Sequence, residues 1–163
     1  MNPNVEFLKA NDFMLLLVDI QKVLLDPCED SARLVKNTAT LIDVAKIFGL
    51  PILFSAHNAE KLGGFLPELL LKVDNPAVLN KVEFSCLENE AMMKAVMETG
   101  RKTLLVAGLE THVCIFHTCA HAARMGFRVH VAADAVSTMP TSAFGALSTG
   151  SLASWIASIS RSP

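Results

Sequence analysis

Short apolar runs that alternate with helical patterns constrain the fold of this chain more than any other feature of its sequence. Residues 13–18 are six consecutive apolar residues, Phe-Met-Leu-Leu-Leu-Val, and Asp19 follows them directly. An uninterrupted apolar run of this length is typical of a central parallel strand that is buried on both faces. Three further strands are predicted, over residues 51–55, 102–107 and 127–133, the last one ending before Asp134.

Helices are predicted between these strands, over residues 31–48, 88–99 and 113–125. Ser31 is the expected N-cap of the first helix, and a glycine follows each helix as its stop signal. Residues 57–72 have no clear period and predict an irregular connection. Strands that alternate with helices imply right-handed crossovers and an α/β fold, a three-layer α-β-α sandwich with a central, mostly parallel sheet.

The length of 163 residues is that of a single domain, residues 1–163, and the 52% apolar content predicts a globular chain with a thick core. Residues 138–163 differ from the rest because Ser, Ala, Gly and Thr dominate them. A short helix is expected over residues 151–159, and the fold is expected to be shortened at its C-terminus.

Charge and apolar content exclude several classes of partner. The net charge of −2, without a cluster of basic residues, argues against a nucleic-acid partner. No apolar run reaches the roughly 18–20 residues of a membrane span, and the first residues do not resemble a signal peptide. We therefore expect a cytoplasmic protein with no membrane partner. The four cysteines lack CxxC spacing, so neither a zinc site nor a thioredoxin-like motif is indicated. Because no signal peptide is recognised, we expect free thiols.

Ligands of open parallel sheets bind beyond the carboxyl ends of the strands. In this chain that edge holds Asp19, residues 55–57, the segment from Gly108 to Cys114, and Asp134. A cysteine at a helix N-terminus is exposed to the positive end of the helix dipole, which favours the nucleophilic thiolate. Cys114 is therefore a candidate nucleophile; the alternative is a small buried apolar residue, the usual place of a free cysteine. Asp134 is interpreted as a structural hydrogen-bonding residue.

Four segments resemble the isochorismatase-like cysteine hydrolases. They are Leu-Leu-Leu-Val-Asp-Ile-Gln at residues 15–21, Asn-Lys-Val-Glu-Phe-Ser at 80–85, Gly-Leu-Glu-Thr-His-Val-Cys at 108–114, and the strand at 126–137. The resemblance runs from about residue 12 to residue 137 and implies a Rossmann-like topology. Nicotinamidases are more distant relatives of the same family.

The resemblance implies a triad of Asp19, Lys81 and Cys114. In this triad the thiol attacks a carbonyl carbon, the carboxylate is the base, and the ammonium favours both negative charges. It also implies an oxyanion hole made of the backbone N–H groups of Glu110 and Cys114, and a cis peptide bond between Leu109 and Glu110. Cleavage of isochorismate, the reaction that gives the family its name, is not expected, because family members that catalyse it lack the nucleophilic cysteine.

Several further residues are candidates for binding a substrate. Phe84, with Phe54 and Phe65, is expected to form an apolar wall, and His57 and His112 are expected to contact the substrate. Nicotinamidase relatives bind a metal through one Asp and two His residues after the second strand. Residues 55–61 contain a single His, so we expect no metal and no cofactor. His117 and His121, four apart on a helix, are interpreted as interface or core residues.

Three hypotheses about function remain open at this point. The first is a metal-independent cysteine hydrolase of a small amide- or ester-like molecule, with a C–N bond as the preferred target. The second is a catalytically impaired homologue that serves as a binding or assembly module. The third is a thiol-redox protein that uses Cys114 and Cys119, whose side chains on one helix are expected to point in different directions. A homo-oligomer is expected, as for many relatives.

Overall fold

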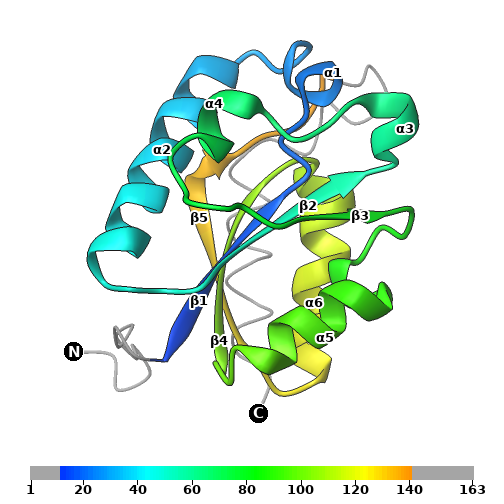
Figure 1. The fold of residues 1–163 in the computed structure, drawn as a ribbon. Coiled ribbons are helices and arrows are strands. Elements are labelled where there is room, and N and C mark those ends of the chain that lie inside the picture. The colour runs from blue at the N-terminus through cyan, green and yellow to red at the C-terminus, as the bar shows by residue number, and fades with distance from the viewer. Residues whose placement is uncertain (1–11, 141–163) are drawn as a thin grey trace, which may run out of the picture.

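The computed structural model describes residues 12–140 and shows a sheet of five parallel strands in the order β3-β2-β1-β4-β5 (Figure 1). The strands are β1 (Phe13–Val18), β2 (Ile52–His57), β3 (Val78–Lys81), β4 (Thr103–Gly108) and β5 (Arg128–Val136). β1 lies at the centre and pairs with β2 and β4. Its six apolar residues are all buried, as expected for a strand covered on both faces.

The helices cover both faces of the sheet, which confirms the predicted three-layer architecture (Figure 1). α2 packs on one face, and α5 and α6 pack on the other. The short helices α1, α3 and α4 lie near the carboxyl ends of the strands. The helices are α1 (Lys22–Leu25), α2 (Ser31–Ile47), α3 (Ala59–Leu62), α4 (Pro67–Leu70), the 3-10 helix η1 (Cys86–Glu88), α5 (Glu90–Glu98), the π-helix η2 (Thr111–Ile115) and α6 (Phe116–Arg124).

Alternate side chains of β1 belong to two separate hydrophobic clusters. Leu15 and Leu17 pack with residues of α2, whereas Met14, Leu16 and Val18 pack with residues of α5 and α6. This division follows from the two-residue period of a strand, which sends successive side chains to opposite faces. The central strand therefore holds both layers of helices and ends at Asp19.

One strand was missed in the sequence. β3 has only four residues, and two of them, Asn80 and Lys81, are polar. It pairs in parallel with β2, and His57 lies opposite Lys81 at the end of the ladder. The connection over residues 57–72 is also more ordered than predicted, because His57 still belongs to β2 and α3 and α4 follow.

Several predicted helix ends shift by one or a few residues. Ser31 is the first residue of α2 rather than its N-cap; Asp30 takes the cap position, and its carboxylate pairs with Arg33 instead of capping the helix. Asn89 caps α5, with its side chain accepting the Met92 N–H. The helix that carries Cys114 starts earlier than expected, as the π-helix η2.

The sequence predicted that the last strand ends before Asp134, and this prediction is wrong. β5 continues to Val136 after an irregularity opposite Val106 and Gly108, and Asp134 lies exposed within it. The Asp134 carbonyl accepts hydrogen bonds from Arg33 and Asn37 of α2. The hydrogen bonds of Asp134 are thus structural, as interpreted, and they attach β5 to α2.

The unusual composition of residues 138–163 concerns mostly residues beyond Pro140. The predicted helix at 151–159 lies outside the described residues. Within residues 12–140, every helix is too short or too polar to cross a lipid bilayer.

Candidate active site

Asp19 lies at the carboxyl end of β1, at the centre of the sheet edge. Its backbone has a positive φ of 53°, its N–H donates to the Ser55 carbonyl at 3.1 Å, and its side chain is fully buried. One carboxylate oxygen, Oδ1, accepts a hydrogen bond of 2.7 Å from the Ser55 hydroxyl. The other oxygen, Oδ2, accepts one of 2.6 Å from the Lys81 ammonium. Both oxygens of this buried carboxylate therefore have donors.

Lys81 ends β3, two strands away from Asp19. Its ammonium is buried and donates to Asp19 Oδ2, to the Glu83 carbonyl at 3.1 Å and to the Cys114 sulfur at 3.6 Å. Burial lowers the pKa of Lys81, but the charges of Asp19 and of the neighbouring thiols raise it more, so that the pKa lies above its ordinary value. The lysine is therefore a fixed positive charge between a carboxylate and a thiol.

Cys114 lies in η2, the turn between β4 and α6. Its thiol is almost completely buried. Burial and the Asp19 carboxylate raise the pKa of Cys114 to about 12, although Lys81 acts to lower it. The shift is opposite in direction to the one expected from the helix N-terminus, because desolvation and a neighbouring negative charge both favour the thiol. The resting group is a thiol beside a carboxylate that can accept its proton.

Two residues behind the carboxylate were given no role from the sequence, although Ser55 lies in the segment 55–57 that was expected at this edge. Ser55 is fully buried in β2 and contacts Asp19 through both its backbone and its hydroxyl. The Cys86 thiol donates to the same hydroxyl at 3.5 Å, and burial, followed by the charge of Asp19, raises the pKa of Cys86 to about 11. A serine within an apolar strand carries no local signal for this role, because its partner is 36 residues away.

Residues 108–114, which we call the nucleophile turn, connect β4 to Cys114. The peptide bond between Leu109 and Glu110 is cis, as the resemblance implied. Among the described residues, no acceptor takes the N–H of Glu110. The turn is anchored to β1 by a hydrogen bond of 2.8 Å from the Leu109 N–H to the Val18 carbonyl.

His57 lies beside the thiol and is held from two sides. Gln21 binds its backbone, accepting the His57 N–H at 2.7 Å and donating to the His57 carbonyl at 3.0 Å. The imidazole stacks on Phe84 with ring centroids 6.1 Å apart. Its Nδ1 is buried and has no hydrogen-bond partner among the described residues. A preorganised polar atom of this kind suits a hydrogen bond to a bound molecule.

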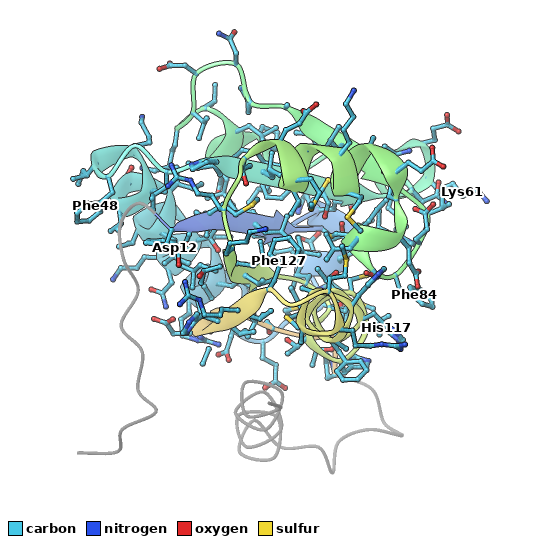
Figure 2. The ribbon with its side chains drawn as sticks, turned by 90° about the horizontal axis from the view of Figure 1, so that it is seen from below. Asp12, Phe48, Lys61, Phe84, His117 and Phe127 are labelled. Carbon is cyan, nitrogen blue, oxygen red and sulfur yellow. The ribbon has the colours of Figure 1, made fainter. Side chains whose placement is uncertain are left out.

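Phe84 is 53% exposed and lies next to His117 (Figure 2). Its ring also contacts that of His57. The other two residues of the expected apolar wall lie elsewhere. Phe54 and Phe65 are buried and pack edge to face against each other, with centroids 5.1 Å apart, in the cluster that includes α2. Phe84 is therefore the only one of the three phenylalanines that is accessible to a ligand.

The two helical histidines have separate contacts. His117 lies at the surface and packs against Phe84 and Phe116, whereas His121 shares a hydrogen bond of 3.2 Å with Ser85. All four cysteines are within the described part of the chain, and none forms a disulfide.

One group of potential metal ligands exists in the described part of the chain, although none was expected. Asp19, His57 and Cys114 each offer one ligand atom within 4.8 Å of the others. The Lys81 ammonium already donates to two of these three groups, so a cation bound there would face a fixed positive charge. The arrangement fits proton transfer better than cation binding.

A parallel α/β sheet that brings a carboxylate, a buried lysine and a thiol together at its carboxyl edge defines the class: a Rossmann-like protein with an Asp-Lys-Cys centre. Comparisons with known proteins identify the family that has this fold. The family model described as Isochorismatase domain matches residues 13–160, and the chain belongs to the isochorismatase family.

The relatives include proteins named as hydrolases. The chain is 36% identical over 135 residues to the probable hydrolase YcaC of Escherichia coli, covering 80% of this chain and 65% of that protein. It thus spans less than two thirds of the length of this curated relative. The crystal structure of the same relative, described as an octameric hydrolase of unknown specificity, superposes with a TM-score of 0.82 and 30% identity, over 93% of this chain and 74% of that one.

Two further solved structures share the fold. YcaC from Pseudomonas aeruginosa, with hexane-2,5-diol and covalent acrylamide, has a TM-score of 0.83 and 28% identity, over 93% of this chain and 75% of that chain. The nicotinamidase/pyrazinamidase of Bacillus subtilis has a TM-score of 0.70 and 17% identity, over 90% of this chain and 93% of that chain. At 17% identity the likeness is one of fold alone.

Proposed function

We propose that this chain is a metal-independent cysteine hydrolase of a small amide- or ester-like molecule, with the C–N bond of an amide as the preferred target. One observation carries the proposal: the buried Lys81 ammonium donates both to the Asp19 carboxylate, at 2.6 Å, and to the Cys114 sulfur, at 3.6 Å. A charge buried in this way is costly unless it is paired, and here it stabilises the two groups that an acyl transfer needs.

In the proposed reaction Asp19 takes the Sγ proton while the Cys114 sulfur attacks the carbonyl carbon. The C=O electron pair moves to oxygen, where the N–H groups of Glu110 and Cys114 stabilise the negative charge. The intermediate collapses, the C–N or C–O bond breaks, and Asp19 gives its proton to the leaving group. A water molecule deprotonated by Asp19 then attacks the thioester, the acid departs, and the thiol recovers its proton. Lys81 stabilises the charge on sulfur and on the carboxylate throughout.

Three side chains are proposed to bind the substrate. Phe84 offers an exposed ring at the edge of the site, His57 offers its buried Nδ1, and His112 lies two residues before the nucleophile. No metal, cofactor, nucleic acid or membrane takes part in the proposed function, and the location is cytoplasmic. Because the E. coli relative is described as octameric, we also propose a homo-oligomer.

The test is turnover of p-nitrophenyl acetate, a small activated ester, together with mass spectrometry of the acyl-enzyme. We expect an acetyl group on Cys114 and release of p-nitrophenolate by the wild type, and loss of both in Cys114→Ser with the circular dichroism spectrum unchanged. Cys119→Ala is the matched control, since it also removes a buried thiol but not one that Lys81 contacts.

Turnover that survives in Cys114→Ser would refute the proposed nucleophile. A folded wild type that forms no acyl-enzyme with this ester or with acetamide, and whose Cys114 does not add to acrylamide, would favour the impaired homologue that acts as a binding or assembly module. Acrylamide is an electrophile for thiols, and the Pseudomonas relative carries it covalently. Equal loss of function in Cys114→Ser and Cys119→Ala would favour the redox hypothesis.

A further inference from the structure

The chain that follows β5 is hydrogen-bonded along the nucleophile turn. Thr111 donates twice to the Ser137 carbonyl, from its N–H at 3.1 Å and from its hydroxyl at 2.7 Å. The Ser137 N–H returns a hydrogen bond of 3.3 Å to the Gly108 carbonyl. The backbone on both sides of Glu110 is thus tied to a single residue of the neighbouring segment.

The Glu110 side chain makes a second set of contacts with that segment. Its Oε2 accepts hydrogen bonds from the Thr138 hydroxyl and, at 3.1 Å, from the Met139 N–H. The carboxylate is 9% exposed, and its other oxygen, Oε1, is buried without a partner among the described residues. A buried acidic side chain whose hydrogen bonds come from residues 138 and 139 has no role in the proposed reaction, so these contacts require another explanation.

His112 extends this network by one residue. Its Nδ1 lies 2.6 Å from the Thr138 hydroxyl oxygen. A threonine hydroxyl has a single proton, and Thr138 donates it to Glu110, so the histidine Nδ1 must be the donor to Thr138. The three side chains form a directed chain, His112 to Thr138 to Glu110, in which the Thr138 hydroxyl bonds to both neighbours; His112 Nδ1 and Glu110 Oε2 lie 4.0 Å apart.

We infer that Thr138 and the Glu110 carboxylate are positioning residues for the oxyanion hole. This inference rests on the proposed function, in which the Glu110 N–H stabilises the oxyanion. The side chain and the N–H of Glu110 share one Cα atom. Two donors from residues 138 and 139 fix the side chain, and Ser137 fixes the backbone before and after it. The direction of the Glu110 N–H is therefore fixed before a substrate binds. Such preorganised donors are what makes an oxyanion hole effective.

The experiment compares Thr138→Val, which removes the hydroxyl at constant shape, with Thr138→Ser, which keeps it. Two reactions of Cys114 are measured. Turnover of p-nitrophenyl acetate passes through an oxyanion, whereas alkylation by iodoacetamide displaces iodide and needs only a reactive sulfur. Thr40→Val, on the exposed side of α2, is the matched control for loss of a threonine hydroxyl. Glu110→Met, which removes the acceptor oxygens at similar side-chain length, repeats the test if Thr138→Val is poorly folded.

We expect Thr138→Val to lower kcat for the ester about 10- to 100-fold, below the roughly 100- to 1000-fold effect of deleting an oxyanion donor. KM and the alkylation rate should stay near the wild-type values, and Thr138→Ser should recover most of kcat. An unchanged kcat in Thr138→Val, or equal losses of kcat and alkylation, would overturn the inference while leaving the proposed function in place. A wild type that forms no acyl-enzyme would overturn both.

Discussion

Gly108 packs against the backbone of Val18 so closely that a Cβ atom on residue 108 would overlap the Val18 carbonyl oxygen. Gly108 also has a φ of 127°, a conformation that residues with a side chain rarely adopt. The two residues end neighbouring strands, β4 and β1, and are paired in register. This contact limits how closely the nucleophile turn can approach Asp19. A substitution of Gly108 therefore tests whether the site needs this close approach.

Gly108→Ala is expected to lower the free energy of unfolding by about 3 kcal/mol or more, because steric overlap with a backbone atom adds to backbone strain. Gly126→Ala is the matched control. Gly126 also has a positive φ, of 85°, but its Cβ would meet no atom within 4 Å. We expect a loss of about 1–2 kcal/mol there. Urea unfolding measures both, and equal losses would show that φ alone, not the contact with Val18, requires glycine.

The charges around Cys114 predict opposite effects of two substitutions on its pKa. After burial, the Asp19 carboxylate is the largest cause that raises this pKa, whereas Lys81 lowers it. Asp19→Asn should therefore lower the thiol pKa and speed alkylation by iodoacetamide at pH 8. Lys81→Met should raise the pKa and slow alkylation. Each unit of pKa changes the thiolate fraction by about tenfold in this range.

The measurement is the alkylation rate of Cys114 from pH 6 to 11, read by mass spectrometry, with ester turnover measured in parallel. Asp19→Asn should lose turnover while it gains alkylation, since the proposed base is gone although the thiolate is more abundant. If Asp19→Asn lost both turnover and alkylation, Asp19 would increase the reactivity of the Cys114 sulfur even without a substrate, contrary to the prediction.

Two fully buried threonines predict stability changes of opposite sign. The Thr38 hydroxyl in α2 has no hydrogen-bond partner among the described residues, whereas the Thr118 hydroxyl in α6 accepts the Cys86 N–H at 2.9 Å. Thr38→Val removes an unsatisfied polar group and should raise the free energy of unfolding by up to about 1 kcal/mol. Thr118→Val leaves a buried N–H without its acceptor and should cost about 1–3 kcal/mol. Thermal or urea unfolding of the two valine variants checks the signs; a loss in both would contradict the prediction for Thr38.

The buried thiols predict a loss of stability at alkaline pH. Burial raises the pKa of Cys86 to about 11 and of Cys114 and Cys119 to about 12, from an ordinary value of 9.0. Above pH 9 the unfolded chain releases thiol protons that the folded chain keeps, so unfolding becomes more favourable as the pH rises. Each such thiol contributes a slope of about 1.4 kcal/mol per pH unit in that range.

Urea unfolding at intervals between pH 8 and 10.5, in the presence of a reductant, measures this slope. Cys119→Ala should reduce it by about one thiol's contribution, or 1.4 kcal/mol per pH unit, because one titrating group is removed. A slope that Cys119→Ala leaves unchanged would mean that the Cys119 thiol titrates alike in the folded and unfolded chains.

Asp19 and Cys114 were within reach of sequence reasoning because each follows a buried apolar strand closely. The carboxyl ends of parallel strands meet at one edge, so local patterns were enough to predict that these two residues lie near each other. Lys81 was different. Its strand has four residues and no distinct alternation, and only the resemblance to a family selected it. Ser55 was expected at the same edge, within residues 55–57, but its contact with Asp19 was not predicted, since a serine in a strand is ordinary until its partner is known.

Asp134 shows the limit of the same reasoning. It stands at the end of an apolar pattern, as Asp19 does, yet the strand continues past it and its carbonyl bonds to α2. Nothing local distinguishes the two aspartates, because the irregularity that shifts the end of β5 arises from its pairing with β4.

The sequence by itself determined the alternation of strands and helices, the parallel sheet and the edge at which the site forms, because these follow from periodicity and from residues that stop helices. Only the tertiary structure decided that the Lys81 ammonium reaches both Asp19 and Cys114, that Ser55 supports the carboxylate, that the thiol pKa is raised, and that Thr138 holds Glu110. These contacts join residues 28 to 62 positions apart. The order and register of the strands set such distances, and no short stretch of sequence encodes them.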